Sequence, residues 1–307
     1  MRAKRGNRAA GAREERRKRS KARDRDVSHH AVRPLVTGHG PVWLPDVRAL
    51  TRPWLQIFAG GLVLLYLLER TLLATQSLNY VPSVLLLGAF LVPVTFVAYL
   101  YERLPRWEVP LPPLAVCFFG GGALGTVVAG SLEYDLLGSL GVLALLGVGL
   151  IEEGAKLILP LIFYFLGRYR SEGAGIVLGV STAMGFAALE TMGCGFMTLL
   201  LQSQGNLVAL DEVMLARGLT SPAGHASWTG LVCAVLWRER KRAGRAVVNA
   251  RILGAFATAV VLHALWDTFN LLRGTTFIGF LSLELLSLLV AVLSLTLLIR
   301  RVREASR

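Results

Sequence analysis

The sequence contains few charged side chains for its length. Asp, Glu, Lys and Arg make up 17% of its 307 residues, whereas about 25% is usual in a soluble domain. Hydrophobic residues make up 54%, and the mean hydropathy is +0.55. The apolar stretches are long runs, not the short alternating segments of a membrane barrel. The composition therefore excludes an ordinary soluble domain and predicts an all-α, polytopic membrane protein.

Cysteines and local catalytic motifs are also scarce. The three cysteines, Cys117, Cys194 and Cys233, lie in apolar segments without CxxC spacing, which argues against a disulfide framework or a zinc knuckle. Neither HExxH nor GxSxG occurs. The first apolar run begins near Pro53, which is too late and too long for a cleavable signal peptide, so we expect it to be an uncleaved anchor.

Basic residues are unevenly distributed along the chain. The first 33 residues hold 13 Lys or Arg and 4 Asp or Glu, out of a net charge of +13 for the whole sequence. We predict that residues 1–45 form a basic, disordered cytoplasmic tail and that residues 46–307 form a helical membrane domain. The tail is interpreted as a topology signal that contacts anionic lipid, and we expect no nucleic-acid partner.

Eight apolar segments are near or above the length of a spanning helix, apart from the short sixth. They are Pro53–Ala74, Pro82–Tyr101, Pro112–Gly130, Leu136–Leu166, Gly173–Leu201, Pro222–Trp237, Ile252–Leu272 and Phe277–Ile299. Basic clusters lie in every second connection, and the connections at Ser131–Asp135 and Gln202–Ser221 are expected to be outer loops. Because cytoplasmic loops are rich in Lys and Arg, we predict eight transmembrane helices with both termini in the cytoplasm.

Charged residues interrupt the fourth apolar segment. Glu152 and Lys156 are four residues apart, and Glu153 and Lys156 are three apart, so both carboxylates can reach the same ammonium on one helix. A charged group in a bilayer costs roughly 2.5–3.5 kcal/mol on insertion scales. Such groups persist in membrane helices when they are paired, hydrated or functional.

Three later segments also carry isolated polar residues at a similar distance from their cytoplasmic ends. The fifth segment contains Glu190, the sixth contains His225, and the seventh contains His263. Asp267 and Asn270 follow His263 on the same helix face, where an Asp one turn away can fix the tautomer of a His. Pairing with Lys156 explains Glu152 alone equally well, and a single His is more often an interhelical hydrogen-bonding residue, but together these residues predict one polar layer within the membrane.

Carboxylates and imidazoles in a partly dry cavity suit peptide hydrolysis. A buried Glu can take a proton from water, and imidazoles can stabilise an oxyanion or protonate a leaving amine. In an alternative arrangement, the His pair and one Glu hold zinc and leave a position open for water. The sequence assigns no metal ligand, and no cofactor is required if a Glu activates the water.

The motifs resemble those of the PrsW intramembrane proteases, within the superfamily of CAAX-type prenyl endopeptidases and bacteriocin-processing proteases. The resemblance covers about 137–272 and rests on EExxK, a Phe four residues before Glu, a His after Pro and Gly, and a His four residues before Asp. These are Glu152-Glu153-x-x-Lys156, Phe186-x-x-x-Glu190, His225 and His263-x-x-x-Asp267. CAAX enzymes have Arg, His and usually Asn where this chain has Lys156, Glu190 and Asp267, so the PrsW branch is favoured over prenylated substrates.

The resemblance implies a glutamic-type protease, or a metalloprotease if a metal is bound. It implies that Glu152 or Glu153 activates water and that the substrate is a membrane-anchored protein, with an anti-sigma factor as the candidate. We expect His225 and His263 to stabilise the oxyanion, Asp267 to orient His263 and Lys156 to tune the Glu pair. Phe186, Glu190 and Asn270 are supporting residues, and the expected location is the plasma membrane of a bacterium.

A proton- or cation-coupled transporter is the alternative from another class, because buried Glu, His and Lys also mark ion paths. Many transporters consist of repeated halves, and this sequence has no second EExxK-like segment. An inactive scaffold is a third interpretation. A residue capable of chemistry at each motif position argues against it.

Overall fold

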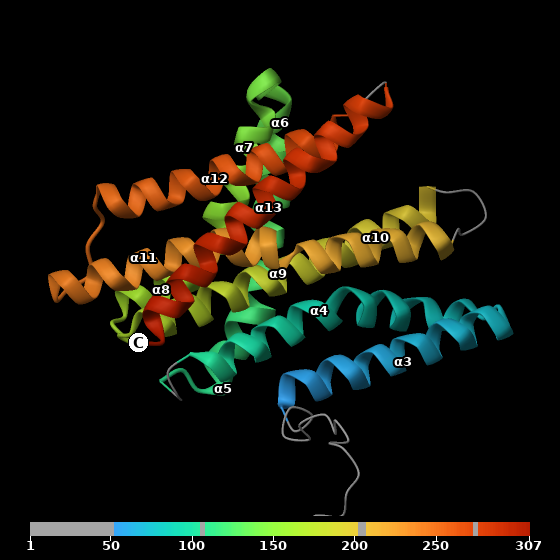
Figure 1. Cartoon of the computed structure of the whole chain (residues 1–307), viewed down its shortest axis with the longest axis horizontal. Coiled ribbons are helices and arrows are strands. Elements are labelled where there is room, and N and C mark those ends of the chain that lie inside the picture. Colours follow the sequence, from blue (N-terminus) through green and yellow to red (C-terminus); the bar gives the residue numbers. More distant parts are fainter. Residues whose placement is uncertain (1–51, 105–107, 202–206, 273–275) are drawn as a thin grey trace, which may run out of the picture. The chain divides into compact units, whose positions relative to one another are not determined.

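A computed structural model describes residues 52–104, 108–201, 207–272 and 276–307, which form helices and no strands. The predicted N-terminal tail lies outside these described residues. In chain order the helices are α3 (Pro53–Thr75), α4 (Val81–Arg103), α5 (Leu111–Ala115), α6 (Gly122–Leu140), α7 (Ala144–Lys156), α8 (Ile158–Phe165), α9 (Glu172–Leu201), α10 (Leu207–Thr220), α11 (Ser227–Ala243), α12 (Ala250–Leu271) and α13 (Phe277–Ala305) (Figure 1). Shorter turns are η1 (Leu78–Tyr80), η2 (Val116–Gly121), η3 (Gly141–Leu143) and η4 (Pro222–Ala226). The all-helical class is confirmed.

Two of the predicted outer loops are wrong. Residues 131–135 are helical, because α6 continues to Leu140 and ends where Gly141 adopts a positive φ of 53°. Most of the second loop forms α10, which packs against α9 and α4. The fourth apolar segment is correspondingly divided between the end of α6, the turn η3, and the short helices α7 and α8.

Helix α9 forms the centre of the described fold. It contacts α4, α6, α10 and α11, and its residues from Gly173 to Ala188 are all buried. Close approach depends on small side chains, since a Cβ at Gly179 would overlap Cys233 of α11 and one at Gly175 would overlap Trp237. The spacing of Gly175 and Gly179 therefore serves close helix packing.

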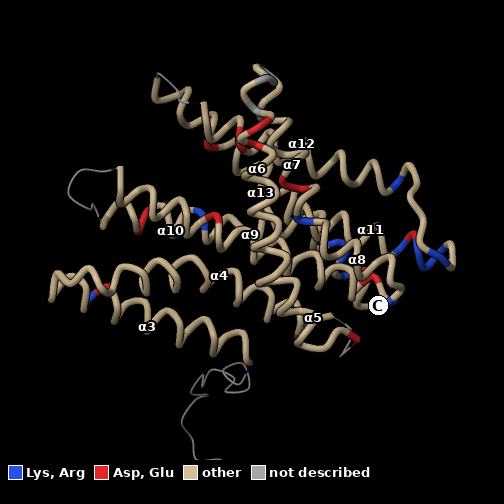
Figure 2. The backbone as a smooth tube through the Cα atoms, turned by 180° about the vertical axis from the view of Figure 1, so that it is seen from behind, with Lys and Arg blue, Asp and Glu red and all other residues tan. Residues whose placement is uncertain are grey.

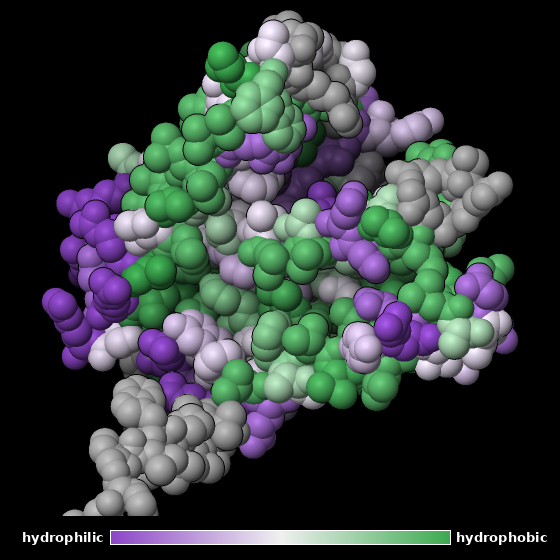
Figure 3. Space-filling model, turned by 45° about the vertical axis from the view of Figure 1, so that its right-hand side comes forward, coloured by the Kyte–Doolittle hydropathy of each residue, from purple (hydrophilic) through white to green (hydrophobic). Residues whose placement is uncertain are grey.

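Six of the described helical stretches are long and apolar enough to cross a membrane. They correspond to six of the eight predicted segments. The other two predicted segments contain the short helices α7 and α8, and α11 with its charged end. Hydrophobic residues cover broad areas of the surface, while hydrophilic residues gather at the left edge, at the lower right and in a hollow (Figure 3). The protein is a multi-pass membrane protein.

Several helix ends meet at one end of this bundle. The backbone N–H of Trp54 at the start of α3 donates to Glu102 Oε1 near the end of α4, at 3.1 Å. Ser306 Oγ, just after α13, donates to the carbonyl oxygen of Arg103 at 3.5 Å. The start of α3 and the end of the chain therefore lie at the same end of the bundle, but the cytoplasmic orientation stays a prediction.

Candidate active site

Lys156, the last residue of α7, is the centre of a buried polar cluster. Its Nζ donates to Glu152 Oε2 at 3.0 Å, to Glu153 Oε1 at 2.8 Å and to His225 Nδ1 at 2.8 Å. The ammonium also lies 4.4 Å from the centroid of the Phe186 ring, a cation–π distance. An ammonium has three donors and no acceptor, so these three acceptors satisfy it completely. A neutral His225 must then carry its proton on Nε2.

The two adjacent glutamates occupy different environments. Glu153 is fully buried, and it accepts hydrogen bonds from Lys156, from Thr229 Oγ1 at 2.9 Å and from His263 Nδ1 at 3.0 Å. Glu152 keeps 7% of its surface exposed and uses only its Oε2 in the hydrogen bonds among the described residues. Glu152 therefore has an oxygen available for a water or a ligand, whereas Glu153 does not.

His263 of α12 is held on both ring nitrogens. Its Nδ1 faces Glu153, and its Nε2 lies 3.3 Å from Asp267 Oδ2, one helical turn away as the spacing predicted. The ring stacks on Trp228 with centroids 4.5 Å apart, and Trp228 Nε1 donates to Ser294 Oγ at 2.9 Å. A carboxylate on each side stabilises positive charge on the imidazole.

Glu190 of α9 links His225 to a cation from α10. Its Oε1 lies 2.5 Å from Arg217 Nη2, and its Oε2 lies 3.2 Å from His225 Nε2. The second contact is not aligned as a hydrogen bond, so Glu190 Oε2 is a buried oxygen without a hydrogen-bond partner among the described residues. His225 reaches this position from η4, a wide π-helical turn in which Ala226 N donates to Ser221 O at 3.2 Å.

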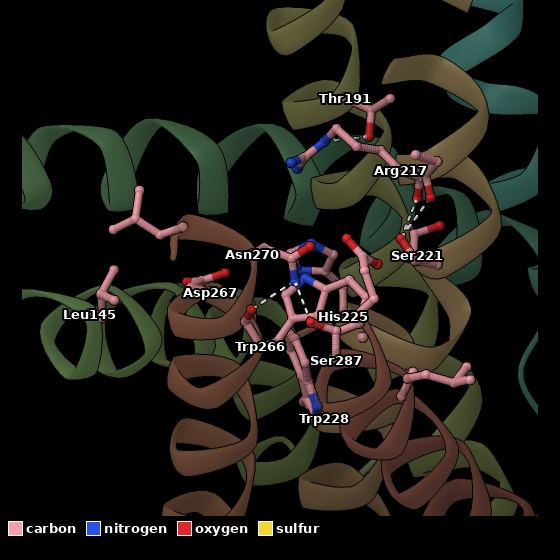
Figure 4. A pocket seen from close by; sticks show the side chains of 17 residues that line it. Leu145, Thr191, Arg217, Ser221, His225, Trp228, Trp266, Asp267, Asn270 and Ser287 are labelled. Carbon is pink, nitrogen blue, oxygen red and sulfur yellow. Dashed lines mark hydrogen bonds between the residues drawn. The ribbon is translucent and has the colours of Figure 1, made fainter. Parts of the chain in front are cut away.

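A cavity of about 670 Å³ adjoins this cluster, and His225 and Asp267 lie in its wall. Figure 4 shows the labelled side chains surrounding it, with Asn270 donating to the Trp266 carbonyl oxygen at 2.8 Å. The wall combines polar and apolar side chains from α7, α9, α10, η4, α11, α12 and α13. The cavity is large enough to receive part of a polypeptide, and it lies beside the buried Glu and His residues.

All nine residues predicted for the site lie in this cluster or in the cavity wall. Sequence reasoning missed Arg217, Thr229 and Glu133. Arg217 was assigned to an outer loop, and Thr229 carries no charge that would mark it in an apolar helix. Glu133 of α6 interacts electrostatically with Glu152 and Glu190, and its Oε1 is buried without a hydrogen-bond partner among the described residues. In the sequence, the signal that could have pointed to Glu133 was its position in an acidic segment.

The fold and this cluster define a multi-pass membrane protein with buried Glu and His residues beside a cavity. The model of the family described as "PrsW family intramembrane metalloprotease" matches residues 76–298. The chain therefore belongs to the PrsW family of intramembrane proteases. No curated protein and no solved structure matches it.

The family description implies a metal, and three residues of the cluster fit one. Glu152, Glu190 and His225 offer ligand atoms that all lie within 4.8 Å of one another. Two carboxylates and an imidazole suit zinc with an open position, and Glu190 Oε2 has no hydrogen-bond partner among the described residues. This set differs from the predicted pair of His and one Glu, since Glu153 and Asp267 already face the two nitrogens of His263.

Proposed function

We propose that this intramembrane protease hydrolyses a peptide bond of a membrane-anchored protein in the cavity beside Glu152, His225 and Asp267. The observation that carries the proposal is the contrast between the two adjacent glutamates. Glu153 makes three hydrogen bonds in a fully buried position, whereas Glu152 retains an oxygen and some exposure. Glu152 is thus the group suited to proton transfer, and Glu153 positions Lys156 and His263.

The reaction follows from these positions. Water attacks the carbonyl carbon of the scissile bond, and its proton passes to Glu152. The carbonyl oxygen becomes an oxyanion, which the Nε2–H of His225 and the positive surroundings of His263 stabilise. The proton on Glu152 then passes to the leaving nitrogen as the C–N bond breaks, which leaves a new carboxyl group and a new amine.

If the enzyme is of the metallo type, Glu152, Glu190 and His225 are the residues that would hold the metal, and His225 would bind it through Nε2 after losing the proton there. A bound metal would polarise the carbonyl group and make water a better nucleophile at neutral pH. Arg217 holds Glu190 Oε1 and so leaves Glu190 Oε2 directed toward His225. Glu152 and His225 therefore serve in either type of chemistry, whereas Glu190 acts as a ligand only in the metallo type.

The proposed substrate is a single-pass membrane protein, with an anti-sigma factor as the candidate, and the proposed location is the plasma membrane of a bacterium. The cluster lies among helices that form a multi-pass membrane protein, so the substrate segment must also enter from the bilayer. Transport is not favoured, because the described cavity adjoins a group of residues that matches a protease family.

The test is cleavage of a candidate single-pass substrate by the purified full chain in detergent. Glu152→Gln should lower the cleavage rate by about 10²–10⁴-fold, the usual contribution of a general base. Glu212→Gln removes an exposed carboxylate on α10 and is the matched control. Full activity in a Glu152→Gln/Glu153→Gln double variant would refute the assignment. Repeating the assay with a chelator, alongside metal analysis of the protein, separates the glutamic from the metallo type.

A further inference from the structure

A second cleft lies between α11, α12 and α13, at the end of the bundle where these helices carry their basic residues. It has a volume of about 430 Å³, and four of its wall residues are arginines: Arg238, Arg242, Arg251 and Arg301. Figure 2 shows the basic residues gathered at this end, around the end of α11 and the C-terminus. None of these residues belongs to the candidate active site.

Acidic side chains hold the four guanidinium groups in place. Glu239, whose side chain is 4% exposed, accepts from Arg242 at 2.6 Å and from Arg251 at 3.1 Å. The hydrogen bond from Asn249, followed by those from Arg242 and Arg251, lowers the pKa of Glu239 to about 2. Arg238 contacts Glu172 and Glu304, and Arg301 contacts Glu304 at 2.9 Å. Three helices thus present preordered arginines to one cleft.

These contacts leave much of the donor capacity unused. A guanidinium has five N–H donors in a planar fork. In the contacts among the described residues, Arg242, Arg251 and Arg301 each use one nitrogen, and Arg238 uses two. Residues 238–251 also carry six basic side chains and one acidic side chain, so the region has a positive charge surplus. The remaining donors match the oxygens of a phosphate group.

The rest of the wall is apolar. Leu231 and Val235 of α11, Ala255 of α12 and Leu297 of α13 line it next to the arginines. The cleft therefore changes from charged near the arginine-bearing ends of α12 and α13 to apolar further along these two candidate membrane spans. A phospholipid has the same order of groups at the surface of a bilayer, with a phosphate above its acyl chains.

We propose that this cleft binds an anionic phospholipid of the phosphatidylglycerol type, with its phosphate on Arg242, Arg251 and Arg301 and an acyl chain along Leu231 and Leu297. The arginines would bind the singly charged phosphate of this lipid. The apolar wall favours a phosphate that carries acyl chains over a soluble phosphate. The site is separate from the protease cavity, so its test is independent of the proposed function.

The experiment is native mass spectrometry of the purified full chain with phosphatidylglycerol and phosphatidylcholine of identical acyl chains. We expect the wild type to prefer phosphatidylglycerol. Each basic residue near an anionic surface contributes about fivefold in binding, so losing two should weaken phosphatidylglycerol binding on the order of 20-fold. The test variant is Glu239→Gln/Arg242→Gln/Arg251→Gln, which removes the buried carboxylate together with its partners and leaves no unpaired charge behind.

The matched control is Arg168→Gln/Arg170→Gln. Both arginines are exposed, lie outside the cleft wall and follow α8 at the same end of the bundle, where Tyr164 Oη donates to the Val247 carbonyl oxygen. This control loses more net charge than the test variant and should keep the lipid preference. An unchanged preference in the test variant would overturn the proposal. Displacement of the lipid by inorganic phosphate alone would also overturn it, because the cleft would then be a site for soluble phosphate.

Discussion

At the scale of single residues, the cluster depends on one ammonium group. Charged side chains within a bilayer cost roughly 2.5–3.5 kcal/mol each on insertion scales. Lys156 offsets this cost for Glu152 and Glu153, and all three of its donors have an acceptor. Because one acceptor is His225, the same contacts also connect α7 to η4. Lys156 therefore offsets one of the two carboxylate charges and sets the tautomer of a candidate catalytic His.

We expect Lys156→Met to lower the free energy of unfolding by about 3–5 kcal/mol, the usual effect of breaking a buried ion pair. The physical reason is that Glu153, which is fully buried, would keep its charge without its cation. Denaturant unfolding in detergent micelles measures the loss. The double variant Lys156→Met/Glu153→Gln should recover part of it, since the unpaired charge is gone. A single variant as stable as the wild type would contradict this account.

At the scale of helices, α9 determines how closely the other elements approach the site. Its small residues allow the backbone of η2 to lie directly against it, and a Cβ at Gly185 would overlap the carbonyl oxygen of Phe118. The next residue, Phe186, covers Lys156, and Glu190 follows one turn later. The packing of α9 therefore fixes the depth at which its two site residues meet those of α7 and η4.

Gly185→Ala should lower the free energy of unfolding by about 1–3 kcal/mol, because the clash is with backbone atoms, which cannot rotate away. Gly193→Ala on the same helix is the matched control, since a Cβ there would meet no atom within 4 Å. It should be neutral or slightly stabilising, because Ala favours the helix by about 1 kcal/mol over Gly. Equal unfolding midpoints for the two variants in detergent would argue against the close approach of η2 and α9.

At the scale of the whole described bundle, charge separates its two ends. The start of α3, the end of α4 and the end of α13 meet at one end, and the arginines of α11 and α12 lie there too. The positive-inside rule predicts that this end faces the cytoplasm. The arginine cleft would then face the leaflet that is rich in anionic lipid.

A labelling experiment tests this orientation. In a background without the three native cysteines, Arg245→Cys should react with a membrane-impermeant maleimide only in inside-out vesicles. Asn79→Cys, an exposed position between α3 and α4 at the opposite end, should react only in right-side-out vesicles. Labelling of both positions from the same side would exclude the predicted topology.

The sequence by itself determined the class of the protein and predicted nearly all of the residues that meet in the candidate site. Long apolar runs require helices in a bilayer, where every backbone polar group must be satisfied within its own segment. Ionisable residues such as Glu152, Glu190 and His263 are conspicuous there because their burial is costly. Spacing alone also predicted that Lys156 reaches both glutamates and that Asp267 reaches His263.

Only the tertiary structure decided which groups contact one another across helices. It distinguished the saturated Glu153 from the more open Glu152, grouped Glu152 and Glu190 with His225 instead of pairing the two His, and brought Arg217 in from a segment predicted to be a loop. The physical reason is that helical periodicity relates residues within one segment, whereas partners on different helices depend on packing distances. Those distances are set by close approaches such as that of Gly185 to η2, which no local pattern encodes.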